Sequence, residues 1–320
     1  MGRLVEGEWV TDKQWHDAGD GRFKRKPTTF RGQLSTDGST PHPVESGRYH
    51  LYASWACPWA HRVLIVRKLR GLEEHIGLSV VDHHMTEDGW HFSDEPGAIP
   101  DSVNGAKFLR EVYVKADPKV STRVTVPVLW DKKEETIVNN ESRELIRMLD
   151  TTALELGDPD VTFCPPGMEE RIDEVITAIY DPINNGVYRS GFAGSQDAYL
   201  EAVTELFEAL DHWDEVLGKQ RYLCGDVLTE ADWCLFTTLL RFDLVYYTHF
   251  KCNLRHVYEY PNLFNYLKAL YQIPGVRDVC NFEHIKRHYF GSHKSINPHG
   301  IVPKGPRIAL GGAHDRDRFA

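Results

Sequence analysis

The sequence predicts an α/β domain followed by an all-α domain, and three observations support this prediction. Residues 48–54 alternate in polarity and are rich in β-forming side chains, as in a strand. Residues 59–70 have the apolar spacing of a helix, so strand and helix follow each other directly. Beyond residue 168 only helical patterns occur, with amphipathic helices expected at 169–181, 195–218, 229–250 and 261–272. A chain of 320 residues can form two such domains.

The order of elements in the first domain narrows its fold. After the helix at 59–70 we expect a strand at 78–84, a long insertion at 85–122, a strand at 125–131, a polar turn, a strand at 136–140 and a helix at 141–149. This βαβ…ββα order ends in a hairpin. It therefore matches a thioredoxin-like domain better than a doubly wound sheet.

Composition changes divide the chain further. We expect a polar amino-terminal extension at 1–46, the thioredoxin-like domain at 47–153, a linker at 154–168, the helical domain at 169–290 and a carboxy-terminal tail at 291–320. Within the helical part, Thr229 and Asp232 form a capping-box-like pair that predicts a helix start.

Charge and cysteine usage exclude several classes of protein. The formal net charge of -10 disfavours nonspecific binding to nucleic acid or to an anionic membrane. The sequence contains neither an uninterrupted apolar run of spanning length nor the apolar region of a signal peptide. The six cysteines are widely spaced and form no disulfide framework, which predicts a cytoplasmic protein with reduced thiols.

The most informative motif is Cys57-Pro58-Trp59-Ala60, which places a thiol at the start of a helix directly after a strand. The helix dipole stabilises a thiolate there, so we expect the pKa of Cys57 to lie below its usual value of about 8.5. Ala60 occupies the position of a second cysteine, so an external thiol must resolve any mixed disulfide. The alternative is a buried, unreactive cysteine.

Pro127 is the second informative residue, because it lies within an otherwise apolar strand. A trans proline on an edge strand is the alternative, but the combination with Cys57 favours a cis Val126-Pro127 bond beside the thiol. The backbone before such a proline can pair with a peptide-like ligand as an added strand.

The third motif is Asn140-Glu141-Ser142 at the start of a predicted helix. Ser142 and its amide can hold an α-carboxylate while Glu141 holds the ammonium group of the same ligand. A simple helix cap is the alternative. Together, the thiol, the proline and this acid–serine turn imply a ligand such as glutathione.

These motifs resemble the glutathione transferase superfamily, in which a thioredoxin-like domain precedes a helical bundle of the transferase type. Longer segments are similar to its Xi class, the glutathionyl-hydroquinone reductases: SWACPWAHR at 54–62, NNESRELIR at 139–147, DPINNGVYRSGFA at 181–193 and HYFGSHKSINPHGIVPKGP at 288–306. The resemblance covers nearly the whole chain, including the extension and the tail.

The resemblance implies glutathione-dependent reduction of glutathionyl-hydroquinones to hydroquinones by a homodimer. In this family's pattern, Cys57 forms a mixed disulfide with glutathione, and a second glutathione resolves it. A tyrosine proton donor maps to Tyr188, and Tyr246 and Tyr289 match tyrosines that support the thiol or line the quinone site. The implied glutathione contacts are Trp90, Arg123, Val124, Thr125, Val126, Glu141 and Ser142.

Core packing is the alternative for each aromatic residue. The neighbour Tyr247 leaves the register of Tyr246 open, and Phe290 replaces the second tyrosine that the family often has beside Tyr289. No histidine or cysteine group has zinc spacing, so we expect no metal. We also expect no tightly bound cofactor. Glutathione or a relative such as γ-glutamylcysteine, which has the same head group and sulfur, is the expected co-substrate.

Other functions compete with this reading. A conjugating transferase keeps glutathione as a thiolate through a Ser or Tyr hydrogen bond, whereas Cys57 would form a disulfide with it. A glutaredoxin-like thiol transferase would use the same thiol on other disulfides. A non-catalytic binding module would not require Cys57, Arg123 or Tyr188.

Overall fold

The computed structural model describes residues 2–11 and 19–319, which divide into two compact units. The first contains 26–162 with 2–11 and 278–293, and the second contains 163–277 with 19–25 and 294–319. These limits differ from the predicted domains, because part of the extension belongs to the helical unit and residues 278–293 belong to the first unit. Residues 1, 12–18 and 320 of the predicted extension and tail lie outside the described residues.

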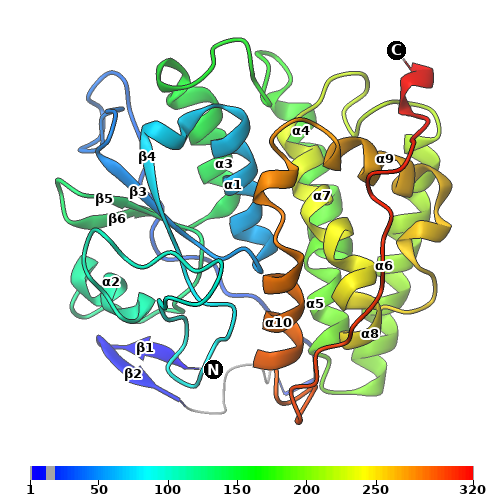
Figure 1. Cartoon of the computed structure of the whole chain (residues 1–320), viewed down its shortest axis with the longest axis horizontal. Coiled ribbons are helices and arrows are strands. Elements are labelled where there is room, and N and C mark those ends of the chain that lie inside the picture. The colour runs from blue at the N-terminus through cyan, green and yellow to red at the C-terminus, as the bar shows by residue number, and fades with distance from the viewer. Residues whose placement is uncertain (1, 12–18, 320) are drawn as a thin grey trace. The chain divides into compact units, whose positions relative to one another are not determined.

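A four-stranded sheet in the order β4-β3-β5-β6 forms the centre of the first unit (Figure 1). Strand β3 pairs in parallel with β4 and antiparallel with β5, and β5 pairs antiparallel with β6. This confirms the predicted thioredoxin-like order. The strands are β3 (Tyr49–Ala53), β4 (Ile76–Val80), β5 (Val128–Asp131) and β6 (Thr136–Asn139).

Helices α1 and α3 pack against each other beside this sheet. Two further helices of the unit were not predicted. One lies within the insertion, where Leu109, Val112 and Tyr113 form a buried stripe at helical spacing. The other occupies residues 282–292. The helices are α1 (Pro58–Leu69), α2 (Leu109–Ala116), α3 (Ser142–Arg147), which continues as a π-helical turn at Met148–Thr152, and α10 (Phe282–Ser292).

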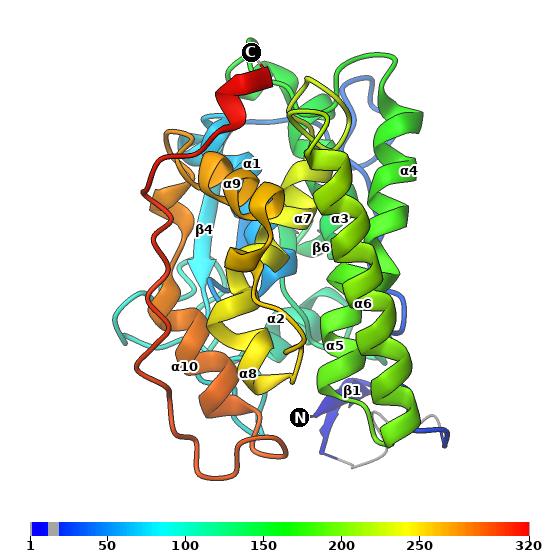
Figure 2. The ribbon, with the colours of Figure 1, turned by 90° about the vertical axis from the view of Figure 1, so that its right-hand side faces the viewer.

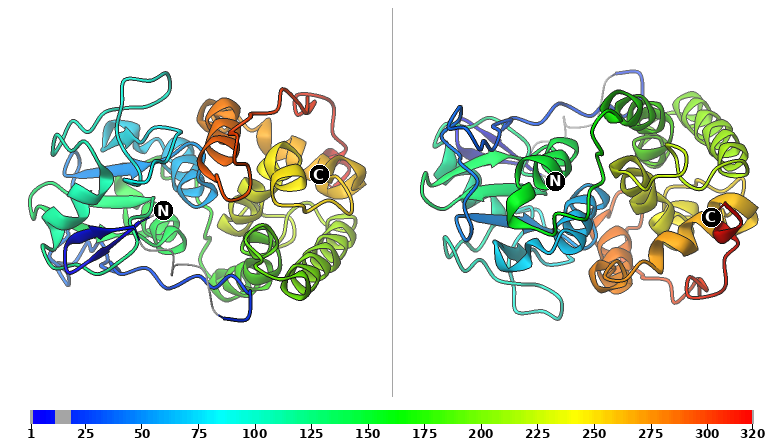
Figure 3. Two further views of the ribbon diagram at one scale, coloured as in Figure 1. Left: turned by 90° about the horizontal axis from the view of Figure 1, so that it is seen from below. Right: turned by 90° about the horizontal axis from the view of Figure 1, so that it is seen from above.

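The amino-terminal extension is more regular than its polar sequence predicts. Strands β1 (Arg3–Val5) and β2 (Glu8–Val10) form an antiparallel hairpin. The Gly32 amide then donates to the Val138 carbonyl at 2.8 Å, so the extension runs along the β6 edge of the sheet (Figure 3). Such a cover satisfies backbone groups that an exposed edge strand would leave unpaired.

The second unit is helical, as predicted, and Figure 2 shows its long helix α6 beside α5. The predicted helix 169–181 ends in a π-helical turn at Tyr180–Asn184, and the predicted helix 229–250 is interrupted by one at Phe242–Tyr246. The predicted capping box is confirmed by the Thr229 amide, which donates to Asp232 at 2.8 Å. The helices are α4 (Glu169–Ile179), α5 (Gly186–Gly191), α6 (Gln196–Leu217), α7 (Glu230–Arg241), α8 (Tyr247–His249) and α9 (Pro261–Tyr271).

Short 3₁₀ turns connect these elements, at Leu72–Glu74, Leu154–Leu156, Val257–Glu259, Arg277–Val279 and Arg316–Phe319. All six cysteines lie in the described part of the chain, and no disulfide joins any of them. Across residues 2–11 and 19–319, no helix combines the length and apolarity that crossing a bilayer requires.

A buried ion pair lies at the carboxyl end of β5, and a histidine of the extension contacts it. Asp131 has no exposed side-chain surface, and Arg48 donates to both of its oxygens at 2.8 and 2.6 Å. His42 of the extension lies 2.8 Å from the same carboxylate. Burial opposes the charged form, but the hydrogen bonds from Arg48 and His42 outweigh burial and lower the pKa of Asp131 to about 2.

We therefore predict that Asp131→Asn lowers the free energy of unfolding at pH 7 by about 3–5 kcal/mol, because it leaves the buried Arg48 without its charged partner. The native pKa lies below the unfolded value of about 3.9, so this stabilisation is present above about pH 4 and is lost toward pH 2. Urea unfolding of wild type and variant, followed by circular dichroism, should show a smaller difference at about pH 2.5 than at pH 7.

The exposed carboxylate of Asp37 in the same extension provides the control. Asp37→Asn should change stability by less than about 0.5 kcal/mol. An Asp131→Asn effect that is equally small, or that does not change with pH, would contradict the role of this ion pair.

Candidate functional site

Cys57 is the N-cap residue of the 12-residue helix α1, and Pro58 is the first helical residue, as predicted. The residue has extended backbone angles (φ -78°, ψ 121°), and its carbonyl accepts the His61 amide at 3.0 Å. The half-buried thiol donates to the Val126 carbonyl, with Sγ and O 3.6 Å apart. The thiol therefore lies at the positive end of a helix and faces the segment before β5.

The Val126-Pro127 peptide bond is cis, which confirms the prediction from the sequence. Because β5 pairs antiparallel with β3, its amino end lies beside the carboxyl end of β3, from which the chain leads to Cys57. The backbone of Val126 is thus next to the thiol, where an extended ligand backbone can pair with it.

Tyr113 of α2 holds the half-buried segment Arg123–Val126 in place. Its hydroxyl donates to the Thr125 carbonyl at 2.8 Å and accepts from the Thr125 amide at 3.2 Å. The Asn140 side-chain amide donates to the same hydroxyl at 3.0 Å. Burial raises the pKa of the Tyr113 phenol, so it remains protonated at neutral pH. One buried phenol thereby links the cis-proline segment to the acid–serine turn.

Glu141 is the N-cap residue of α3, so the cap that the sequence suggested as the alternative is present. Its Oε1 accepts the Arg143 amide at 3.3 Å, and its Oε2 accepts the Thr28 hydroxyl at 3.3 Å. Ser142 is buried, and Arg62 donates to its hydroxyl at 3.5 Å. A half-buried carboxylate with both oxygens held in this way is suited to a cationic group, so the cap and a ligand role are compatible.

Trp90 and Tyr289 are both in the first unit. The indole of Trp90 stacks on His288 of α10 with ring centroids 4.7 Å apart, and Tyr289 meets His288 and His293 edge-on. The predicted domain limits placed Tyr289 with the helical domain. Its helix instead packs on the insertion, where His284 of α10 lies 2.8 Å from the Pro96 carbonyl.

Tyr188 and Tyr246 are brought together in the second unit. Their rings meet edge-on with centroids 6.0 Å apart, and Phe250 stacks on Tyr246 at 5.5 Å. The Arg25 guanidinium lies 5.1 Å from the centroid of the Tyr188 ring. Tyr188 is 9% exposed and Tyr246 is fully buried. The expectation of aromatic packing therefore holds for both rings, and their chemical roles stay predictions.

Tyr247 takes a different direction from Tyr246. Its ring stacks on His256 with centroids 3.5 Å apart. The structure therefore places Tyr246, and not its neighbour, beside Tyr188.

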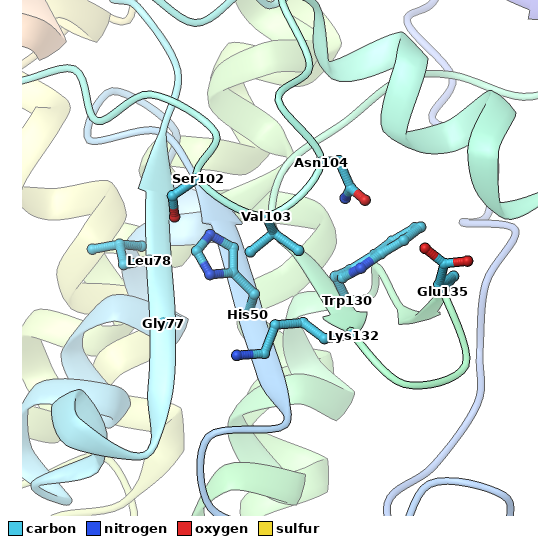
Figure 4. Close-up of a pocket in the computed structure, with 9 residues that line it drawn as sticks. All are labelled: His50, Gly77, Leu78, Ser102, Val103, Asn104, Trp130, Lys132 and Glu135. Carbon is cyan, nitrogen blue, oxygen red and sulfur yellow. The ribbon is translucent and has the colours of Figure 1, made fainter.

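A separate polar pocket of about 540 Å³ lies at the other end of β3 (Figure 4). His50 is near the amino end of this strand, and burial lowers its pKa to about 4, so the ring is neutral at pH 7. A Cβ atom at Gly77 would lie 2.4 Å from His50 Nδ1, so this close approach requires glycine. No predicted site residue is among those that line the pocket: His50, Gly77, Leu78, Ser102, Val103, Asn104, Trp130, Lys132 and Glu135.

The sequence reasoning missed Tyr113, Thr28 and His288, which contact the predicted site residues directly. Tyr113 and Thr28 lie in segments without a motif, so local sequence contained no signal for them. His288 begins the segment 288–306 that resembles the family, but nothing in that segment indicated its contact with Trp90. Asn140, by contrast, was visible in the motif beside Glu141. Among the described residues, no group of three or more His, Cys, Asp or Glu side chains is arranged to hold a metal ion.

Comparison with known proteins identifies the class to which this fold and site belong. Residues 56–152 match the family description "Glutathione S-transferase, N-terminal domain", and residues 196–269 match "Glutathione S-transferase, C-terminal domain". The chain is 50% identical to the glutathionyl-hydroquinone reductase YqjG of Escherichia coli, with 99% of both chains covered. It is 48% identical to the glutathionyl-hydroquinone reductase PcpF of Sphingobium chlorophenolicum, with 98% of both covered.

Solved structures agree with the sequence comparisons. A Xi class transferase from Natrialba magadii superposes with a TM-score of 0.95 at 51% identity, over 100% of this chain and 98% of that one. The glutathione-bound structure of YqjG superposes with a TM-score of 0.89 at 49% identity, over 99% of both. The chain therefore belongs to the glutathione transferase family, within its Xi class of glutathionyl-hydroquinone reductases.

The contacts of Tyr113 lead to a prediction. Tyr113→Phe removes one hydroxyl and leaves the Thr125 amide and the Asn140 side chain without a buried partner, so we expect a loss of about 1–3 kcal/mol in unfolding free energy. Because the segment 123–126 loosens, KM for glutathione should also rise. Steady-state assays and urea unfolding measure the two effects.

Tyr49→Phe is the matched control, because Tyr49 is equally buried and its hydroxyl donates only to Pro43 at 2.6 Å. It should lower stability without changing KM. An unchanged KM in Tyr113→Phe would show that this phenol contributes to folding alone.

Proposed function

We propose that this protein reduces glutathionyl-hydroquinones to hydroquinones with glutathione as the reductant. The observation that carries the proposal is the Cys57 thiol at the start of α1, 3.6 Å from the carbonyl of a cis X-Pro peptide. Ala60 stands where a second cysteine would resolve the thiol internally. The names of two curated relatives at 50% and 48% identity, both glutathionyl-hydroquinone reductases, support the same activity.

The reaction has two balanced steps. In the first, the Cys57 thiolate attacks the sulfur of the glutathionyl group, the bond from that sulfur to the aromatic ring breaks, and the ring carbon takes a proton. This step yields the hydroquinone and a mixed disulfide between Cys57 and glutathione. In the second, the thiolate of another glutathione attacks the mixed disulfide, releases the Cys57 thiolate and leaves as glutathione disulfide.

The glutathione site combines the three segments described above. Glu141 holds the ammonium of the γ-glutamyl group, and Ser142 holds its α-carboxylate. The backbone of Val126 pairs with the cysteinyl residue, and this orients the ligand sulfur toward Cys57. Four further residues complete the site. Arg123 offsets carboxylate charge, Val124 and Thr125 extend the segment that pairs with the ligand, and Trp90 covers the ligand.

Tyr188 supplies the proton that the aromatic ring takes, because a phenol donates without carrying charge at neutral pH. The adjacent Arg25 guanidinium supports this role, since a positive charge over the ring stabilises the phenoxide left by proton transfer. Tyr246 and Tyr289 support the aromatic site or the thiol. We further propose that the enzyme acts in the cytoplasm as a homodimer, where its six cysteines remain reduced.

Two alternatives conflict with particular residues. A conjugating transferase requires glutathione to persist as a free thiolate, whereas Cys57 in contact with the ligand-binding segment would capture it as a disulfide. A non-catalytic binding module would not require a thiol at a helix start. A glutaredoxin-like activity on other disulfides uses the same Cys57 and remains the second candidate function.

Cys57 is the proposed nucleophile, and its replacement tests this role. Cys57→Ser should abolish turnover and retain the fold, because an alcohol cannot form the mixed disulfide and the two side chains are nearly isosteric. Incubation with glutathione disulfide followed by intact-mass measurement should add one glutathione to wild type and none to the variant. Cys280→Ser, which alters another half-buried thiol of the same unit, should behave as wild type. Turnover above a few per cent in Cys57→Ser would reject the assignment.

The proposed role of Tyr188 as proton donor gives another prediction. Tyr188→Phe keeps the packed ring and removes only the hydroxyl, so single-turnover release of hydroquinone should slow by about 10²–10⁴-fold with little change in melting temperature. Tyr247→Phe is the control, because that ring stacks on His256 instead. Near-wild-type release by Tyr188→Phe would remove the proton-donor role and leave packing as the function of this ring.

A further inference from the structure

The amino-terminal extension contacts the backbone that leads into the glutathione segment 123–126. Leu4 of β1 and Thr122 exchange both backbone hydrogen bonds, at 2.9 and 3.0 Å. The Thr29 hydroxyl lies 2.5 Å from the Thr122 hydroxyl. Two separate parts of the extension therefore hold the residue directly before Arg123.

The extension also holds both sides of Glu141. The Phe30 amide donates to the Asn140 side chain at 3.1 Å, and the Asn140 amide donates to the Phe30 carbonyl at 3.1 Å. Thr28, two residues away, then donates its hydroxyl to Glu141 Oε2 at 3.3 Å. Since the Arg143 amide occupies Oε1, each carboxylate oxygen has one donor that fixes its direction.

A third contact lies beside Trp90. The indole of Trp9 donates to the Glu87 carbonyl at 3.1 Å, and a Cβ atom at Gly89 would lie 3.0 Å from the Trp9 ring. The Phe30 ring meets Tyr113 edge-on at 5.8 Å, and Tyr113 in turn holds Thr125. The extension thus supports the segment before Arg123, the turn at Glu141 and the backbone beside Trp90.

We propose that the extension is a positioning element for glutathione and that Thr28 is the positioning residue for the carboxylate of Glu141. This inference rests on the proposed function, in which Glu141 receives the γ-glutamyl ammonium. A carboxylate has about four acceptor positions, so Thr28 and the Arg143 amide can fix its orientation and still leave lone pairs for the ligand. A carboxylate already oriented before binding loses less conformational freedom when glutathione arrives.

The competing explanation is that the extension only covers the edge of β6 and contributes to folding. The two explanations differ in which reactions of Cys57 they affect. A purely structural role alters every reaction of this thiol, whereas an oriented Glu141 matters only for a reactant whose γ-glutamyl ammonium occupies the site, as in the glutathionyl-hydroquinone.

The test replaces Thr28 by the nearly isosteric valine. With glutathionyl-hydroquinone as the varied substrate, Thr28→Val should raise KM about three- to tenfold with kcat changed by less than about twofold, as expected for loss of one hydrogen bond. The second-order rate constant for alkylation of Cys57 by iodoacetamide, which lacks a γ-glutamyl group, should be unchanged. Thr28→Ser should restore the wild-type KM. In a Glu141→Ala background, Thr28→Val should add no further effect.

Thr40→Val is the matched control, because Thr40 is a half-buried threonine of the same extension whose hydroxyl contacts Gln33 and Ser35. It should leave both reactions unchanged. A fall in the alkylation rate of Cys57 as large as the rise in KM, or an unchanged KM for the glutathionyl-hydroquinone, would overturn the positioning role.

Calorimetry separates this inference from the proposed function. Cys57→Ser should bind glutathione without forming a disulfide, and the double variant with Thr28→Val should bind it about three- to tenfold more weakly. Equal affinities would overturn the role of Thr28 and leave the proposed function intact. Absence of glutathione binding by Cys57→Ser would overturn the glutathione site itself, and the inference with it.

Discussion

The antiparallel pairing of β3 with β5 is the constraint on which the rest of the site depends. It brings the amino end of β5 to the carboxyl end of β3, so the Val126 carbonyl comes within 3.6 Å of the Cys57 sulfur. A thiol at a helix start can react with a bound ligand only if the ligand's sulfur lies next to it. The backbone of Val126, before the cis proline, lies directly beside the thiol, where an extended ligand can pair with it.

Around this pair, the structure uses buried polar contacts to hold irregular backbone. The segment 123–126 belongs to no strand. Tyr113 provides hydrogen bonds to Thr125 that a strand partner would otherwise supply, and the extension pairs with Thr122 directly before the segment. Buried groups satisfied in this way give a loop nearly fixed geometry. This explains how a polar extension with little periodicity can be integral to the first unit. Its role follows from its donors and acceptors together with a few buried apolar side chains, Leu4 and Leu34 among them.

In the second unit, packed aromatic rings surround the predicted site residues. The predicted proton donor Tyr188 lies among Phe23, Phe192, Tyr246 and Phe250, with Arg25 as the nearby charge. Packed rings fix the orientation of a phenol at low conformational cost. The π-helical turn that contains Tyr246 ends one residue before Tyr247, and the two neighbours thereby face different surroundings. The order of the helices alone does not specify this difference.

The sequence by itself determined the two-part architecture, the strand–thiol–helix junction, the cis proline and the class of ligand. These features depend on local signals: periodicity, a proline in a strand and a capping residue at a helix start. Only the tertiary structure decided the partners of Thr28 and Tyr113, the union of α10 with the first unit and the choice of Tyr246 over Tyr247. These depend on contacts between segments far apart in the chain, such as the 113 residues between Thr28 and Glu141. Local propensity contains no information about such pairings, because it reports only how a segment folds with its immediate neighbours.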